Sequence, residues 1–302
     1  MSFDHPGLLY QGADDYLRAT TGFVHGAVAA GDAVLVAVPG TNLSTLREAL
    51  SGLDGAVSYA DMADAGRNPG RIIPGLLLAF ADAHPGRRVS IVGEPDWPGR
   101  SAVERPACVQ HEALVNVVFA GRDVTLLCPY DTGALDASDA WLTHPVVIVD
   151  GQRRANPAYG DPVAVAERFN RRLSAAPDDA DRVAYAVPGD LSRVRRFATA
   201  RAVAGGLAAD RTEDLVTAVN ELAENTMVHT SGGGSLTSWV EDGRLVCEIS
   251  DRGFIAEPLA GRIPADPRVP GGRGLLLAHH LCDLVRVHTR PGATTIRLYM
   301  GL

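Results

Sequence analysis

Thr217–Thr230, T-A-V-N-E-L-A-E-N-T-M-V-H-T, is the stretch that decides the fold of the carboxyl-terminal part of the chain. Leu222, Met227 and the small apolar residues around them recur at spacings of three and four, which predicts a helix with one buried face. Glu221 and Asn225 are four residues apart, so they share a face one turn from each other. A carboxylate and an amide in an apolar helix are costly unless they are used. A divalent metal and a phosphate chain would use both, because Asn offers a neutral oxygen ligand and Glu can deprotonate a hydroxyl or water. A surface Glu/Asn pair on an ordinary amphipathic helix is the alternative that this helix alone leaves open.

Two further motifs follow this helix. Val246–Phe254, V-C-E-I-S-D-R-G-F, reads as an apolar strand that ends in Asp251 and is followed by Gly253. Gly271–Asp283, G-G-R-G-L-L-L-A-H-H-L-C-D, is a glycine-rich entry into an apolar helix. The segment 254–271 between them has four prolines and no periodicity, which is typical of a mobile lid.

The ordered set of acidic helix, strand ending in D-x-G and glycine-rich helix entry resembles the GHKL (Bergerat-fold) ATPases. Within that group it is most similar to the anti-sigma-factor serine kinases of bacteria. Any one of these motifs is weakly specific, but their order within about 80 residues is much more specific. The resemblance implies a two-layer α/β sandwich that binds ATP and Mg²⁺.

The resemblance also implies a role for each motif residue. Glu221 would be the general base and Asn225 the magnesium ligand, while Asp251 would accept a hydrogen bond from the adenine amino group. Gly253 would let the backbone approach the base, and Thr294 would contact adenine through a water. The residues whose backbone amides would face the phosphates are Gly272, Arg273, Gly274 and Leu275.

Two details of the implied site stay open. Either Arg268 or Arg273 would reach the γ-phosphate, and the sequence does not choose between them. The family pattern is D-x-G-x-G, but the second glycine is replaced here by Ile255. A branched side chain at that place narrows the hinge of the lid, which bears on turnover more than on the fold.

The amino-terminal half alternates strands with helices. Continuous apolar runs of strand length, such as Ala33–Val38 and Val124–Pro129, predict buried parallel strands. We therefore expect a three-layer, doubly wound α/β domain with a mostly parallel sheet between helices. Residues 5–170 resemble the MEDS sensory domain, a degenerate relative of the RecA-like ATPases. The segments that carry this resemblance are H-P-G-L-L-Y, G-D-A-V-L-V-A-V-P, G-E-P-D-W-P-G-R-S, H-E-A-L-V-N and C-P-Y-D.

Ala37–Thr45 stands where a P-loop would be but has no G-K-[ST], so we expect a sensor or docking domain that does not hydrolyse nucleotide. A small-molecule ligand would lie beyond the carboxyl ends of the strands, near Pro39–Asn42, Glu94–Trp97 and Tyr130–Asp131. Ordinary loops without a ligand are the alternative.

Composition excludes several classes. The 302 residues carry a net charge of −8, so no basic patch indicates nucleic acid or an anionic membrane. No apolar run approaches the length of a membrane span, and the amino terminus has no signal-peptide pattern, so we expect a cytoplasmic protein. All 28 basic residues are arginines, which excludes a P-loop lysine and Schiff-base chemistry.

The cysteines and histidines show no local metal pattern. Cys108, Cys128, Cys247 and Cys282 are scattered in apolar stretches, so buried reduced thiols are favoured over disulfides or a zinc site. His111-Glu112 has the order of a histidine-kinase phosphoacceptor but lacks the residues that usually follow, so a structural histidine is favoured.

We therefore expect a MEDS-like domain at residues 1–172, a linker at 173–182 and a GHKL ATPase domain at 183–302. The leading hypothesis is an ATP-binding switch protein of the anti-sigma-factor serine/threonine kinase type. Its partners would be a sigma factor, a STAS-type anti-anti-sigma protein, or both, with a second copy of the chain as a further partner. The alternatives are a non-catalytic sequestering module with a degenerate nucleotide site, and a protein similar to sensor histidine kinases with His111 as acceptor.

Overall fold

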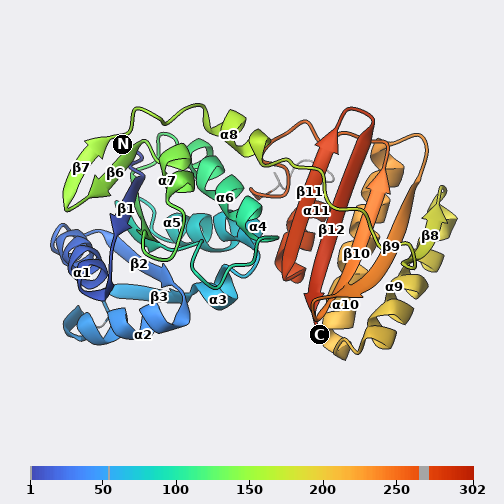
Figure 1. Cartoon of the computed structure of the whole chain (residues 1–302), viewed down its shortest axis with the longest axis horizontal. Coiled ribbons are helices and arrows are strands. Elements are labelled where there is room, and N and C mark those ends of the chain that lie inside the picture. The colour runs from blue at the N-terminus through green and yellow to red at the C-terminus, as the bar shows by residue number, and fades with distance from the viewer. Residues whose placement is uncertain (1, 54, 265–271) are drawn as a thin grey trace. The chain divides into compact units, whose positions relative to one another are not determined.

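The computed structural model describes residues 2–53, 55–264 and 272–302, and the chain forms two compact units, Met1–Phe169 and Asn170–Leu302 (Figure 1). The amino-terminal unit is built on one sheet of seven strands in the order β3-β2-β4-β5-β1-β6-β7. Every pair is parallel except β6 with β7, so the predicted mostly parallel sheet is confirmed. Its strands are β1 (Pro6–Tyr10), β2 (Ala33–Val38), β3 (Val57–Asp61), β4 (Val89–Gly93), β5 (Val124–Asp131), β6 (Val146–Val149) and β7 (Gln152–Ala155).

Burial of both faces explains the apolar strands at the centre of this sheet. All six residues of β2 are buried, and Val34, Val36 and Val38 join one core cluster with residues of α1 and α2. The edge strand β7 is exposed along its whole length and carries no apolar alternation, which is why the sequence did not predict it. The helices of the unit are α1 (Ala13–Ala29), α2 (Gly40–Ala49), α3 (Met62–Ala65), α4 (Pro69–Ile72), α5 (Ala79–Asp82), α6 (Arg105–Val118), α7 (Ser138–Thr143) and α8 (Pro162–Arg168).

One predicted helix is interrupted. The apolar character and length of segment 70–84 predict a single helix, but α4 and α5 are separated by a wider π-type turn over Ile73–Leu78. Pro74 lies in that turn, and since proline has no backbone N–H to donate, the regular α-helical hydrogen bonding is broken there.

The carboxyl-terminal unit is a two-layer α/β sandwich. Its five-stranded antiparallel sheet has the order β11-β12-β10-β9-β8, and the three helices lie on one face of it (Figure 1). The Asp-Gly pair at 242–243 predicts a two-residue hairpin turn, and the structure confirms it, because both residues have positive φ between the paired strands β9 and β10. The elements are β8 (Asp181–Tyr185), α9 (Leu191–Gly205), α10 (Ala209–His229), β9 (Gly234–Glu241), β10 (Arg244–Asp251), α11 (Gly274–Leu281), β11 (Leu284–Arg290) and β12 (Ala293–Gly301).

The central helix α10 is longer than its motif suggested. From the sequence, Thr212 is a candidate for the residue that caps the start of this helix. The helix instead begins at Ala209 and Thr212 is buried inside it, so that prediction is wrong. The inward residues Ala218, Leu222 and Ala223 pack into the unit's core cluster, as the periodicity predicted. Within the described residues, no helix has the length and hydropathy that crossing a bilayer requires.

The start of the carboxyl-terminal unit is tied to the sheet before its first strand. The side chain of Asn170 donates to the Thr289 carbonyl at 2.8 Å and accepts from the Thr289 N–H at 3.0 Å. Ser174, inside the segment expected to be a linker, accepts from the Arg297 guanidinium through its carbonyl at 2.6 Å.

Candidate functional site

The turn of α10 that carries Glu221 and Asn225 faces the first residue of α11. A Cβ added to Gly274 would lie 2.7 Å from Asn225 Nδ2 and 3.3 Å from Glu221 Cβ. A side chain at this position would push the Asn225 amide aside, so glycine lets the start of α11 pack directly against the α10 turn. The structure thus brings together the acidic turn and the glycine-rich helix entry, 50 residues apart along the chain.

Asp251, the last residue of β10, is held by two hydrogen bonds. Its Oδ2 accepts from Thr226 Oγ1 at 2.7 Å, and its Oδ1 accepts from the Gly253 N–H at 2.7 Å. Thr294 is paired directly with Asp251 in the register of β10 with β12, so the two side chains share one end of the sheet. The predicted adenine contacts are therefore neighbours through antiparallel pairing.

Tyr185 supports this end of the site from the edge strand β8. Its hydroxyl donates to Thr226 Oγ1 at 3.1 Å, and Thr226 in turn reaches Asp251. Burial, with a smaller contribution from the Asp251 charge, raises the pKa of Tyr185 to about 12 despite the opposing hydrogen bond with Thr226. The phenol keeps its proton at neutral pH and remains a donor, so the Tyr–Thr–Asp chain has a fixed direction.

These groups open into one cavity of about 430 Å³, which we call the cleft. Such a volume lies within the range of small-molecule sites. The cleft is lined by Leu222, Asn225, Thr226, His229, Thr230, Asp251, Gly253, Phe254, Ile255, Ala256, Glu257, Ala260, Gly261, Gly272, Leu275, Thr294 and Ile296.

Six of the nine predicted site residues line the cleft: Asn225, Asp251, Gly253, Gly272, Leu275 and Thr294. Glu221, Arg273 and Gly274 are not among the lining residues, although Glu221 and Gly274 adjoin Asn225. Arg268 and Gly271 lie outside the described residues. Glu221 and Asn225 are half-buried, and in the described part of the chain neither side chain has a hydrogen-bond partner.

Two threonines at this site, Thr226 and Thr289, were not predicted from the sequence. Thr226 directly follows Asn225 on α10, and a buried hydroxyl next to a predicted site residue could have indicated its role. Thr289 Oγ1 accepts from the Ile255 N–H at 2.9 Å and lies 2.9 Å from Thr294 Oγ1, so it anchors the residue that replaces the second family glycine. Thr230 Oγ1 is buried in the cleft wall without a hydrogen-bond partner among the described residues, which leaves it open to a ligand.

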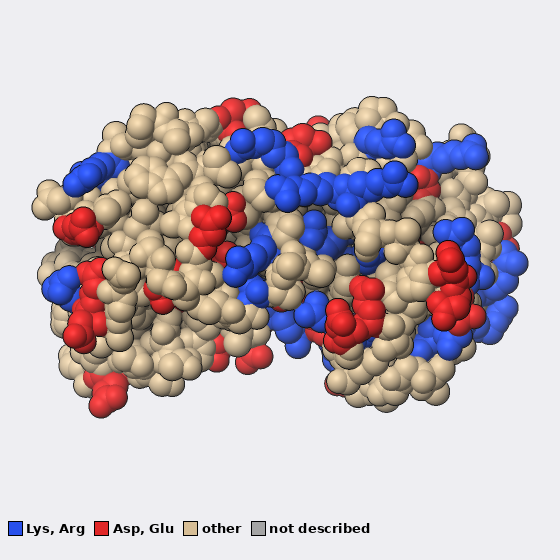
Figure 2. Space-filling model, viewed as in Figure 1, with Lys and Arg blue, Asp and Glu red and all other residues tan. Residues whose placement is uncertain are grey.

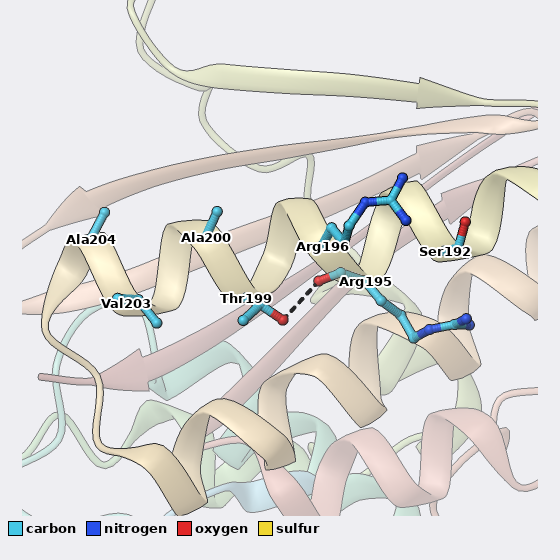
Figure 3. Close-up of a pocket in the computed structure, with 7 residues that line it drawn as sticks. All are labelled: Ser192, Arg195, Arg196, Thr199, Ala200, Val203 and Ala204. Carbon is cyan, nitrogen blue, oxygen red and sulfur yellow. Dashed lines mark hydrogen bonds between the residues drawn. The ribbon is translucent and has the colours of Figure 1, made fainter.

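A larger surface depression, of about 790 Å³, runs along α9 and contains none of the motif residues. Figure 3 shows Arg195 and Arg196 pointing in different directions along this helix, with Ala200 and Val203 between them and its end. Because it is shallow and lacks convergent polar groups, it does not compete with the cleft as a ligand site.

Charge is distributed unevenly between the two units. Residues 170–302 contain 16 arginines and 16 acidic residues, so the net charge of −8 belongs to residues 1–169. Figure 2 shows arginines interspersed with acidic side chains on the face in view of the carboxyl-terminal unit. A neutral unit repels a polyanion such as ATP less than an acidic unit would.

In the amino-terminal unit, two of the loops expected to adjoin are joined by hydrogen bonds. Asn42 Nδ2 donates to both carboxylate oxygens of Glu94, at 3.0 and 2.9 Å, and Tyr16 Oη lies 3.4 Å from Glu94 Oε2. Burial, together with the charges of Asp131 and Asp96, raises the pKa of Glu94 to about 7 against the lowering effect of these hydrogen bonds. A carboxyl group that titrates near neutrality therefore lies beyond the end of β4.

Comparison with protein families agrees with both resemblances. Residues 4–145 match the family model described as MEDS, the methanogen/methylotroph DcmR sensory domain. Residues 184–300 match the model described as a histidine kinase-like ATPase domain. No curated protein matches the chain.

Two solved structures were found to be similar to parts of the chain. The RsbU and RsbW domains of a Mycobacterium tuberculosis protein are 22% identical over 42% of this chain, with a TM-score of 0.32. The match spans only 33% of that structure's own length. The Acinetobacter baumannii histidine kinase AdeS is 11% identical over 46% of this chain and 73% of its own length, with a TM-score of 0.25. The chain thus joins a MEDS domain in its amino-terminal part to a histidine kinase-like ATPase domain in its carboxyl-terminal part.

Proposed function

We propose that the carboxyl-terminal unit binds ATP with Mg²⁺ in the cleft and transfers the γ-phosphoryl group to a Ser or Thr of a partner protein. The protein would be a switch kinase of the anti-sigma-factor type, with a sigma factor or a STAS-type antagonist as partner. The observation that carries this proposal is the convergence of Asn225, Asp251, Gly253, Gly272, Leu275 and Thr294 on one cavity.

The donor set fits the recognition of adenine. The Asp251 carboxylate only accepts hydrogen bonds, which suits the exocyclic amino group of the base. Thr226 and the Gly253 N–H already hold the carboxylate in one orientation, so little order is lost when a base binds. Leu222, Leu275 and Ile296 line the same cavity and offer an apolar surface for the adenine ring.

The residues at the other end of the cleft fit a magnesium ion. Mg²⁺ is usually held by one or two protein oxygens and by phosphate oxygens and waters, and Asn225 offers one amide oxygen that no described residue occupies. When bound, the ion would neutralise charge on the β- and γ-phosphates. Glu221, one turn earlier, would accept the proton of the attacking hydroxyl, and the amides at the start of α11 would face the phosphates.

Calorimetric titration of the full chain with ATP, with and without Mg²⁺, tests nucleotide binding. We expect Asp251→Asn to raise the Kd about 10- to 100-fold, because a hydrogen bond to a charged group contributes about 1.5–3 kcal/mol. Asp242→Asn, in the exposed hairpin turn at φ 47°, is the matched control and should bind like wild type. Equally tight binding by Asp251→Asn would contradict the adenine assignment.

Incubation with γ-labelled ATP and a STAS-type antagonist protein tests phosphoryl transfer. Wild type should leave an acid-stable label on the antagonist, and Glu221→Gln should bind ATP but transfer no label. ATP and partner binding without transfer by wild type would instead favour a sequestering module.

The environment of Ile255 favours this second function, a sequestering module without catalysis. It packs against the core cluster and its N–H is tied to Thr289, so the segment after Gly253 is anchored rather than hinged. The histidine-kinase alternative has less support, because His111 is only 2% exposed and a phosphoacceptor must reach solvent or a donor.

A further inference from the structure

Four side chains from four separate places in the amino-terminal unit meet in its interior. His5 precedes β1, Glu112 lies on α6, Cys128 lies on β5 and His144 follows α7. One nitrogen, sulfur or carboxylate oxygen of each lies within 4.8 Å of those of the other three. None of the four residues is more than 2% exposed. We call them the four-residue cluster.

The outer hydrogen bonds of the two histidines define which ring nitrogen faces the cluster. Asn116 Nδ2 donates to the carbonyls of Glu112, Ala113 and Thr143, so its Oδ1 is the atom that faces His5 Nδ1 at 3.0 Å. His5 Nδ1 must therefore carry the hydrogen. His144 Nδ1 lies 3.0 Å from the Ala140 carbonyl, which can only accept, so it carries a hydrogen too. In both neutral rings the Nε2 lone pair points inward, the arrangement that outer-shell partners impose on metal-binding histidines.

The inward-facing atoms are mostly acceptors that face one another. His5 Nε2 lies 3.1 Å and His144 Nε2 3.4 Å from Glu112 Oε2. Among the four side chains, the Cys128 thiol can supply a hydrogen inward, since its Sγ is 3.5 Å from Glu112 Oε2 and 3.3 Å from His5 Nε2. The buried Tyr130 hydroxyl beside the cluster is a further donor to the Glu112 carboxylate. His144 Nε2 and Glu112 Oε1 are buried without a hydrogen-bond partner among the described residues. Lone pairs packed this closely without water repel one another unless a positive charge lies between them.

The distances and ligand types fit a tetrahedral ion. Zn²⁺ with bonds of about 2.1 Å to nitrogen or oxygen and 2.3 Å to sulfur makes a tetrahedron with edges of about 3.3–3.6 Å. Four of the six edges between the ligand atoms are 3.1, 3.3, 3.4 and 3.5 Å, and the other two are within 4.8 Å. A thiolate, a carboxylate and two neutral imidazoles would also balance the two positive charges of the ion.

We propose that His5, Glu112, Cys128 and His144 form a closed four-coordinate site for Zn²⁺ in the amino-terminal unit. The ion would tie the start of β1 to β5, to α6 and to the loop after α7. With four protein ligands and no solvent exposure it would be structural and would keep no open position for a substrate.

Metal analysis of the untagged full chain tests this site. After purification and dialysis, elemental analysis should find about one zinc per chain. Cys128→Ser and His144→Gln should lose the ion, whereas Cys108→Ser should keep it. Cys108 is the matched control, since it is equally buried in the same unit but its Sγ faces the Pro95 carbonyl at 3.4 Å.

A second measurement uses the wild-type protein alone, so it does not depend on whether the variants fold. Wild type stripped by a chelator and titrated with Co²⁺ should show a thiolate-to-cobalt charge-transfer band and intense tetrahedral ligand-field bands, saturating at one equivalent. Absence of bound zinc together with a featureless cobalt titration would overturn the proposal and leave a protonated His–Glu–Cys hydrogen-bond network. Retention of stoichiometric zinc and of the cobalt band by folded Cys128→Ser would overturn it as well.

Discussion

The cleft of the carboxyl-terminal unit and the four-residue cluster of the amino-terminal unit present polar side chains in opposite ways. At the cleft, Asn225 and the adjoining Glu221 are half-buried and have no hydrogen-bond partner among the described residues. In the cluster, Glu112 and both histidines are sealed from solvent, and the outer nitrogen of each ring is bonded to the protein. Free groups at an open cavity suit a ligand that enters and leaves, whereas sealed groups suit a permanent occupant.

The cleft and the four-residue cluster also differ in which of their groups are held in place. Asn225 at the cleft is unpartnered within the described residues, whereas Asp251 is held by Thr226 and Gly253 and the backbone beneath it is tightly packed. Gly234 pairs with Asp251 across the β9–β10 ladder, and a Cβ at Gly233 would lie 2.2 Å from the Tyr185 carbonyl oxygen. Preorganisation in the cleft therefore comes from its backbone frame together with the Tyr185–Thr226–Asp251 hydrogen bonds, while in the cluster it comes from the side chains alone.

The largest expected effect tests the rigidity of that frame. Gly233 has φ +66° and backbone atoms in the way, so Gly233→Ala should destabilise the carboxyl-terminal unit by about 3–5 kcal/mol through strain and overpacking. Differential scanning calorimetry of the full chain measures the loss. Gly243→Ala is the matched control, because it has φ +69° but nothing within 4 Å of a Cβ, and it should cost about 1 kcal/mol. Equal losses of stability in the two variants would show that the backbone around Gly233 relaxes to accommodate the added methyl group.

The second prediction concerns a sealed carboxyl group of the amino-terminal unit. The pKa of Glu94 is raised from 4.5 to about 7 in the folded state, so the folded chain binds the proton more tightly than the unfolded chain. Stability is then highest below pH 4.5 and declines as the pH rises to 7, by about 3 kcal/mol for this group alone. Glu94→Gln keeps an acceptor for Asn42 and removes this decline. Urea unfolding between pH 5 and 8 measures it.

The matched control for this decline is Glu48→Gln, an exposed carboxylate on α2. Its pH profile should follow that of wild type. The groups that face Glu94 are Asn42, Tyr16, Asp131 and Asp96, and Asp96 contributes in the same direction because burial raises its pKa to about 6. If the dependence of stability on pH were unchanged in Glu94→Gln, Glu94 would be solvated and would not belong with the sealed polar groups of the amino-terminal unit.

The smallest expected effect is in the cleft. Thr226→Val removes the hydroxyl that orients Asp251 but keeps the shape of the side chain, so the ATP Kd should rise about fivefold, or about 1 kcal/mol. Calorimetric titration measures it. Thr217→Val, at an exposed position of the same helix, should bind ATP like wild type. Because Asp251 is retained, a loss of 100-fold or more would show that Thr226 contacts the nucleotide itself.

Local patterns determined the elements and their order. The three-and-four spacing in Thr217–Thr230 predicted α10, the apolar run Ala33–Val38 predicted a central strand, and Asp242-Gly243 predicted the hairpin turn. These signals are carried by residues close in sequence, because helical periodicity, strand alternation and turn backbone are properties of short segments. The order of the motifs was then enough to expect both domain families.

Tertiary structure alone decided which side chains meet. Asp251 was expected at the site, but its bond to Thr226 depends on how α10 packs over β10. The four-residue cluster is the clearest case: His5 and His144 are 139 residues apart, and none of the four shows a local metal-ligand spacing. The sequence favoured buried thiols over a zinc site because spacing reports only neighbours along the chain. Parallel pairing of β1 with β5, and the packing of α6 beside them, is what brings a thiol, a carboxylate and two imidazoles within reach of one ion.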